Sequence, residues 1–254
     1  MKKYLSIFLL ACSTLVSMPS LAQLSDSEAM NMAGLQRSLS QRMVKNYLML
    51  GADVRVDAAQ RQLQETVERF DASQKALNAY APNPAIKAAL AQVDATWATY
   101  RQQIEAKPDH AQAAAIFSTS ETLLQQTQTV SDEMARHLGE MGAAVNRTGQ
   151  TQRIAMLYML KSWKVPAPDI DAKMDKAVSD FETILGELEA RGTPNEEIAA
   201  AQRRARAHWG FTLKGIDMHN TQSSVPTVIT VSTDSLFRQL NELTRLYAGL
   251  QADE

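Results

Sequence analysis

Cysteine, glycine, proline and aromatic residues are all scarce in this sequence. Its 254 residues include one Cys, 10 Gly and 8 Pro, and aromatic side chains make up 6%. The one cysteine is Cys12, so disulfides, thiol catalysis and thiolate metal sites are excluded in the region that follows it. Runs of β-branched residues are nearly absent before Val225, whereas alanine is abundant. This composition is typical of a helical protein.

The N-terminus has the pattern of a signal peptide. Lys2 and Lys3 precede an apolar run over 4–16, and the small-residue motif Ser20-Leu21-Ala22 follows. We therefore expect residues 1–22 to be a signal peptide, cleaved after Ala22, and the protein to be periplasmic. The alternative is a lipoprotein, because Leu9-Leu10-Ala11-Cys12 resembles a lipobox.

Several other features are missing from the rest of the chain. No later segment has the length and hydrophobicity of a membrane helix, so we expect no integral membrane segment. Loss of Lys2 and Lys3 would change the net charge from −2 to −4, which does not favour nucleic acid as a partner. No His-x-x-x-His or Glu-x-x-His pair, glycine-rich phosphate loop or G-x-S-x-G motif occurs. We accordingly predict no metal, no cofactor and no enzymatic activity.

Four landmarks occur twice, in the same order and at nearly the same separation. The pairs are Gln41-Arg42 with Gln152-Arg153, Phe70 with Phe181, Trp97 with Trp209, and Ser120-Glu121 with Thr233-Asp234. The offset is 111 for the first two pairs, 112 for the third and 113 for the last. A period this long indicates a duplicated domain. The repeated tryptophans are expected to be packing anchors.

Turn residues divide the chain into segments with helical periodicity. The expected helices cover 26–50, 57–80, 84–106 and 110–138 in copy one, and 143–163, 168–191, 195–220 and 231–251 in copy two. The run from Val225 to Val231 is interpreted as an extended loop. The predicted fold is all-α, with two tandem up-down four-helix bundles over 23–140 and 141–254. Because no proline lies between Asp109 and Val165, one continuous helix joining the bundles is the alternative for the junction.

A polar stripe runs beside the apolar stripe of the first predicted helix. At 100° per residue, it contains Asn31, Gly34, Ser38, Gln41, Arg42 and Lys45. A glycine inside a helix costs about 1 kcal/mol relative to alanine, a cost that close approach of another backbone would offset. Copy two repeats the stripe in shortened form, with Asn146, Gly149 and Arg153. The stripe predicts an anion site in which Arg42 and Arg153 supply the charge, and the alternative is an ordinary polar surface.

The stretch from Asn31 to Tyr47 resembles the signature of the PilJ-type domain. This is the N-terminal sensory domain of type IV pilus methyl-accepting chemotaxis transducers, and it is related to the ligand domain of nitrate/nitrite sensor kinases. The signature reads approximately N-x-A-G-R-Q-R-M-L-S-Q-R-M-A-K-x-Y, and the matching residues are Asn31, Ala33, Gly34, Gln36, Arg37, Leu39, Ser40, Gln41, Arg42, Met43, Lys45 and Tyr47. Leu35 and Ser38 depart from it, and copy two is similar to a form about one helical turn shorter.

The resemblance implies a sensory protein that binds a small anionic or polar solute, with nitrate as the best-known example. It adds Arg37 to the stripe, so the candidate ligand-binding residues are Asn31, Gly34, Arg37, Gln41, Arg42, Lys45, Asn146, Gly149 and Arg153. In the nitrate sensor kinases the matching helix lies at a dimer interface. We therefore hypothesise that the two copies imitate such a dimer within one chain, with their first helices facing each other.

The expected signalling partner is a membrane sensor kinase or chemoreceptor. The alternative function is an interaction module without a small ligand, which docks onto a membrane receptor, a pilus component or a second copy of itself as a homodimer.

Overall fold

The computed structural model describes residues 24–138, 149–190, 192–219 and 225–252, and this part of the chain is helical without strands. The all-α prediction is therefore confirmed. The predicted signal peptide, with Cys12, lies outside the described residues, as does Asn146. The helices are α1 (Asp26–Gly51), α2 (Val56–Tyr80), α3 (Pro84–Glu105), α4 (His110–Leu138), α5 (Gly149–Ser162), α6 (Ile170–Ala190), α7 (Glu196–His219) and α8 (Pro226–Ala252).

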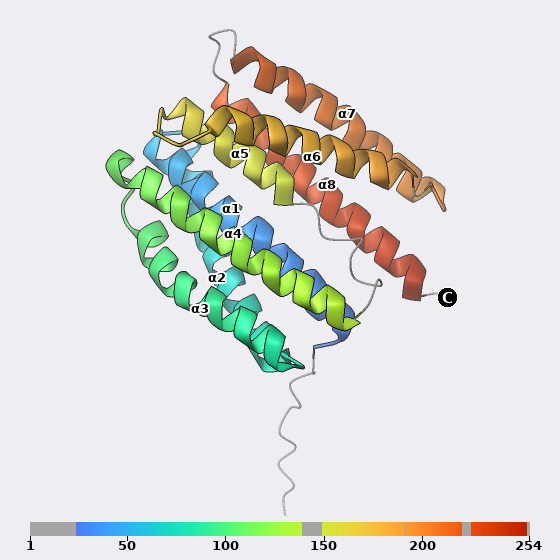
Figure 1. The fold of residues 1–254 in the computed structure, drawn as a ribbon. Coiled ribbons are helices and arrows are strands. Elements are labelled where there is room, and N and C mark those ends of the chain that lie inside the picture. The colour runs from blue at the N-terminus through green and yellow to red at the C-terminus, as the bar shows by residue number, and fades with distance from the viewer. Residues whose placement is uncertain (1–23, 139–148, 191, 220–224, 253–254) are drawn as a thin grey trace, which may run out of the picture.

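Two central helices, α1 and α5, hold the molecule together. Helix α1 packs against α2, α4 and α5, and helix α5 packs against α1, α6 and α8. Figure 1 shows α2 and α3 on one side of this pair and α6 and α7 on the other. Burial on most of their faces explains the apolar run from Ile154 to Leu160 in α5, which has no hydrophilic side.

The two central helices run parallel, and at two levels residues about 111 positions apart lie beside each other. A Cβ added to Gly149 would lie 3.1 Å from the Oγ of Ser38, and one added to Gly51 would overlap the ring of Trp163. The offsets, 111 and 112 residues, are those of the duplication. At these two levels, an approximate two-fold axis between α1 and α5 relates the paired positions.

Helices α4 and α5 are separate and antiparallel. The ring of His110, at the start of α4, meets Trp163, just after α5, with 5.1 Å between ring centroids. Helix α4 ends at Leu138 and α5 begins at Gly149, with 139–148 outside the described residues. The bundles therefore lie side by side, and the alternative of one continuous helix across the junction is excluded by the direction of the two helices.

The same core is built twice. Phe70 packs on Trp97 with 4.4 Å between ring centroids, and Phe181 packs on Trp209 at 4.5 Å. Each indole Nε1 donates to a carboxylate one residue after the phenylalanine, Asp71 in the first half and Glu182 in the second. These contacts make the predicted landmarks packing anchors. The main hydrophobic core runs without interruption through both halves.

The predicted loop from Val225 to Val231 is wrong, because α8 begins at Pro226. Proline suits the first position of a helix, where its missing N–H is not needed. Ile229 is completely buried and packs against α7, where it fills the space left by Gly215. Tertiary burial here outweighs the weak helix propensity of β-branched residues.

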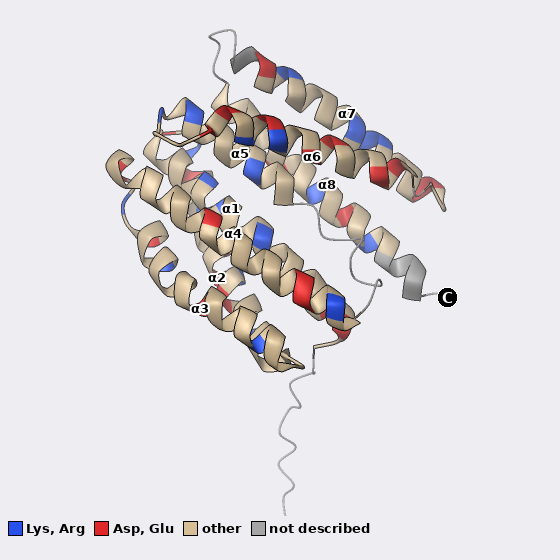
Figure 2. Ribbon diagram, in the orientation of Figure 1, with Lys and Arg blue, Asp and Glu red and all other residues tan. Residues whose placement is uncertain are grey.

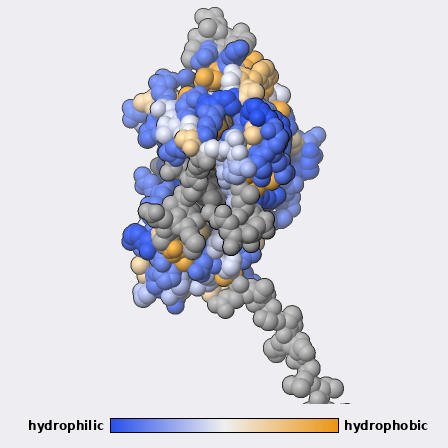
Figure 3. Space-filling model, turned by 90° about the vertical axis from the view of Figure 1, so that its right-hand side faces the viewer, coloured by the Kyte–Doolittle hydropathy of each residue, from blue (hydrophilic) through white to orange (hydrophobic). Residues whose placement is uncertain are grey.

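The outer surface is mostly hydrophilic. Figure 2 shows acidic and basic residues interspersed along the visible faces of α4 and α6. The face in Figure 3 carries only small separate hydrophobic areas among its described residues. No described helix is both long and apolar enough to cross a membrane.

Candidate ligand-binding site

The predicted polar stripe of α1 is a buried packing seam. Gly34, Ser38, Gln41 and Lys45 are all buried, and Asn31 and Arg42 are half-buried. The stripe faces the other half of the molecule, since Ser38 lies against Gly149 of α5. An ordinary solvated surface is therefore excluded for this part of α1.

Lys45 forms a fully buried ion pair across the seam. Its Nζ lies 2.5 Å from Oδ1 of Asp234 on α8, and the two side chains are 0% and 3% exposed. Gln62 of α2 donates to the other oxygen of Asp234 at 3.1 Å, and Gln152 of α5 donates to Oδ1 at 3.3 Å. The carboxylate is therefore held by three helices besides its own.

Burial shifts the two partners of this pair differently. Desolvation lowers the pKa of Lys45 to about 8, and the opposing charge of Asp234 only partly offsets it. Burial would raise the pKa of Asp234, but the charges of Lys45 and Arg42 and its hydrogen bonds outweigh burial and lower that pKa. The contacts therefore stabilise the charged form of Asp234 overall. For Lys45, desolvation destabilises the charged form by more than the pair stabilises it.

Arg153 of α5 forms a second ion pair between the halves. Here the first half supplies the acid and the second half supplies the cation. Its guanidinium binds both oxygens of Glu121 on α4, with Nη1–Oε1 at 2.5 Å and Nη2–Oε2 at 2.8 Å. Nη1 also donates to Oε1 of Gln41 at 3.0 Å. Glu121 and Asp234 are counterparts in the repeat. Each half thus supplies a carboxylate that binds a cation of the other half.

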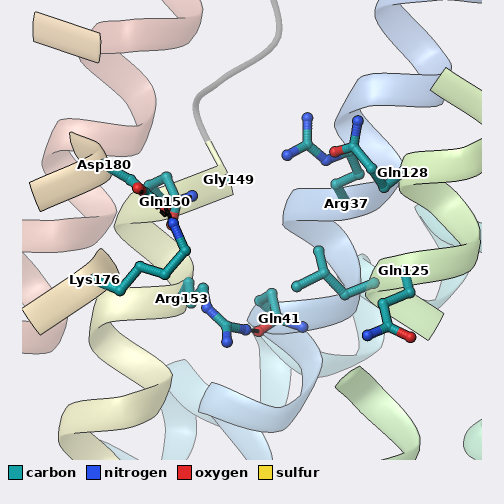
Figure 4. A pocket seen from close by; sticks show the side chains of 10 residues that line it. Arg37, Gln41, Gln125, Gln128, Gly149, Gln150, Arg153, Lys176 and Asp180 are labelled. Carbon is teal, nitrogen blue, oxygen red and sulfur yellow. Dashed lines mark hydrogen bonds and ion pairs between the residues drawn. The ribbon is translucent and has the colours of Figure 1, made fainter. Parts of the chain in front are cut away.

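A cavity of about 340 Å³ opens beside the Arg153 pair. We call it the seam cavity. It is lined from four helices by Arg37, Gln41, Leu124, Gln125, Gln128, Gly149, Gln150, Arg153, Lys176 and Asp180. Figure 4 shows side chains from α1 and α4 facing those of α5 and α6 across it. A second cavity of about 300 Å³ shares Arg37, Gln128, Gln150 and Asp180 with it and extends along α6.

The polar lining of the seam cavity is rich in amides and carries three cations. Lys176 pairs with Asp180 at 2.9 Å, and Arg153 is neutralised by Glu121. Arg37 adds a third cation to the lining. Four glutamines supply amide groups that both donate and accept hydrogen bonds. Such a lining suits a small polar solute with negative charge.

The predicted site residues do not all lie in the seam cavity. Arg37, Gln41, Gly149 and Arg153 line the seam cavity, whereas Lys45 is taken up by the buried pair. Arg42 points the other way, with its guanidinium carbon 5.5 Å from the centroid of the Phe237 ring on α8. Arg42 and Arg153 therefore do not meet in one site.

The acids that bind the seam cations were not among the predicted site residues. Glu121 and Asp234 belong to a repeated landmark, and an acid kept at the same place in both copies was a usable signal. Lys176, Asp180, Gln125 and Gln128 carried no such signal, because only the approach of α4 and α6 makes them cavity residues.

One comparison with known proteins found a match. Residues 21–129 match the family described as the type IV pili methyl-accepting chemotaxis transducer N-terminal domain, PilJ. The match covers α1, α2, α3 and most of α4 and does not extend over the second half. No curated protein and no solved structure matched the chain.

Proposed function

We propose that this chain, whose residues 21–129 form a PilJ-type domain, is a non-enzymatic sensory protein that binds a small anionic or polar solute in the seam cavity. The domain family is described by its place in chemotaxis transducers, which favours a sensory role. The proposal depends chiefly on one observation: four of the nine predicted ligand-binding residues line one cavity between the two halves.

We assign the charge recognition in this cavity mainly to Arg37. Arg153 binds the carboxylate of Glu121 through both Nη groups and also donates to Gln41, so it orients these two side chains at the edge of the cavity. Arg37 lines both cavities and lies across from Gln150 and Asp180 (Figure 4). Nitrate is one solute of suitable charge, and the cavity has room for a larger carboxylate.

The second half is proposed to be a diverged copy of the same domain, with domain limits of 23–140 and 141–254. Its support is the repeated order of helices, the repeated Phe–Trp pairs and the parallel register of α1 and α5. In this proposal the chain reproduces a sensor dimer internally. A solute bound in the cavity contacts both halves, so binding would change how α1 and α5 fit together.

The proposed location is the periplasm, reached through the signal peptide expected at residues 1–22. The proposed partner is a membrane sensor kinase or chemoreceptor that reads the arrangement of the two halves. The competing function is docking onto such a partner without a solute. The saturation of Lys45 and Arg153 by internal carboxylates favours docking, because it leaves fewer cations for a ligand.

A solute panel on the purified protein separates these two functions. Nitrate, nitrite, acetate and larger carboxylates are tested by thermal shift and calorimetry, at equal ionic strength. A stabilising solute should bind at least about tenfold more weakly to Arg37→Gln, because one charge-assisted contact is lost. Arg203→Gln is the matched control, since Arg203 is exposed on α7 and pairs with Glu196. Stabilisation by no solute, or by a solute that binds Arg37→Gln equally well, would favour docking.

A further inference from the structure

Three arginines from three helices gather on the side of α1 away from the seam cavity. Arg42 of α1 lies over Phe237 of α8, and the pKa of Arg69 on α2 is lowered by burial and by the charges of Arg42 and Arg245. We call Arg42, Arg69 and Arg245 the arginine cluster. Its members come from both halves of the molecule, like those of the seam cavity.

The positions of the three arginines along their helices explain why they lie near one another. The Lys45–Asp234–Gln62 contacts tie α1, α8 and α2 together at one level. Because α2 and α8 are each antiparallel to α1, moving toward the N-terminus of α1 means moving toward the C-termini of the other two. Arg42 lies one turn from Lys45, and Arg69 lies two turns from Gln62 on the same helix face. Arg245 lies three turns from Asp234 on the face that also carries Phe237.

The arginine cluster is less well balanced by acids than the seam cavity, since Asp234, whose pKa the charge of Arg42 helps to lower, is already paired with Lys45. By the offsets of the duplication, Arg69 is the counterpart of Asp180, and Arg245 is the counterpart of Asp132. Arg42 is the counterpart of Arg153, which binds Glu121. None of the three arginines forms an ion pair with any carboxylate in the described part of the chain. The approximate two-fold axis thus relates a charge-balanced site to a cationic one.

The geometry of Arg42 leaves its donors available. Stacking on an aromatic ring uses the face of a guanidinium and leaves the N–H groups at its edge to bind an oxyanion. The Nε of Arg42 is buried and has no hydrogen-bond acceptor. A buried donor without an acceptor is unfavourable, so an acceptor from outside the protein would be stabilised there. Arg69 and Arg245 are exposed, which leaves the cluster accessible to a solute.

We propose that Arg42, Arg69 and Arg245 form a second ligand site, for a small oxyanion with two negative charges such as phosphate. Three guanidiniums repel each other, and a dianion that accepts hydrogen bonds from several of them relieves this repulsion better than a monoanion does. The site is separate from the seam cavity, so it does not depend on the proposed function.

Titration calorimetry of the full chain with inorganic phosphate at about pH 8 tests the proposal, with sodium chloride at equal ionic strength as the reference. Phosphate should bind at one site per chain. Arg69→Gln and Arg245→Gln should each weaken that binding at least about tenfold. Both residues are exposed, so the variants should fold, and a circular dichroism melt checks this. Arg203→Gln should bind phosphate as the unmodified chain does, since Arg203 is exposed on α7 and pairs with Glu196.

Three results would overturn the proposal. The first is no binding of phosphate beyond the chloride reference, and the second is an equal loss in Arg203→Gln, which would indicate charge screening alone. The third is loss of binding in Arg37→Gln with normal binding in Arg69→Gln, which would place the phosphate in the seam cavity.

Discussion

Two ion pairs cross the seam through acids at matching positions of the two halves, and these pairs differ in burial. Lys45–Asp234 is 0% and 3% exposed, whereas Arg153–Glu121 is 16% and 24% exposed and borders a cavity. In both, an acid at the same position of the repeat binds a cation of the other half. One arrangement, an acid of one half bound to a cation of the other, therefore occurs as a sealed contact on one side and as an accessible contact on the other.

The largest expected effect on stability comes from removing one partner of the sealed Lys45–Asp234 pair. Lys45→Ala should destabilise the protein by about 3–5 kcal/mol, because Asp234 would remain buried without its counter-charge. Arg153→Ala should cost less than about 2 kcal/mol, because water reaches Glu121. Urea unfolding followed by circular dichroism measures both.

The control for this test is the double variant Lys45→Met with Asp234→Leu. Replacing a buried pair by apolar residues of similar size is often neutral, so most of the stability should return. Equal losses in Lys45→Ala and Arg153→Ala would remove the distinction between a sealed and an accessible pair.

A second test uses the pH dependence of stability. Lys45 has a pKa of about 8 in the folded protein and an ordinary value of 10.5 when unfolded. Between these values the unfolded state binds more protons, so the free energy of unfolding should rise with pH, by at most about 3 kcal/mol. Lys45→Met should lack this increase. Identical slopes from pH 8 to 10.5 in both proteins would show that the pKa of Lys45 is not lowered.

A third test concerns the place where the halves meet at the ends of α1 and α5. Gly51→Ala should cost about 1–3 kcal/mol, because the new Cβ would lie 2.1 Å from Cη2 of Trp163 and the ring must move. Gly186→Ala is the matched control. Its Cβ would meet nothing within 4 Å, so helix propensity should stabilise the protein by about 0.5–1 kcal/mol. A Gly51→Ala melt unchanged from that of the unmodified chain would argue against close packing there.

The smallest expected effect is at the start of α1. With the 111-residue offset, the described start of α5 corresponds to residue 38, so α1 begins 12 residues earlier. Ser25 caps α1, and Glu28 completes the capping box by accepting from the backbone N–H of Ser25 at 2.9 Å. Ser25→Ala should cost about 1 kcal/mol. Thermal melts monitored by circular dichroism measure it, with Thr129→Ala on the exposed face of α4 as the control. A change no larger than that of the control would mean that the extra turns of α1 do not depend on their cap.

Most helix boundaries were predictable, because periodicity and turn residues are local signals. The predicted helices at 84–106 and 110–138 differ from α3 and α4 by one residue at most. The start of α8 was not predictable, because the helical state of Ile229 depends on its burial against α7. Helix α1 begins at Asp26, as the predicted range of 26–50 has it, and is capped by Ser25.

The candidate site was predictable only in part. The spacing of Gly34, Ser38, Gln41 and Lys45 placed them on one face, and the structure buries that face. Spacing within one helix does not say which other helix covers the face. For that reason the opposite directions of Arg42 and Arg153 were not visible in the sequence.

The sequence by itself determined the helices, the repeated landmarks and the polar stripe, because each is a matter of periodicity or repetition along the chain. Only the tertiary structure decided that α1 and α5 pack in parallel, that Glu121 and Asp234 bind cations of the opposite half, and that a cavity opens beside just one of these pairs. These features depend on contacts between residues 32 to 189 positions apart, which no local pattern encodes.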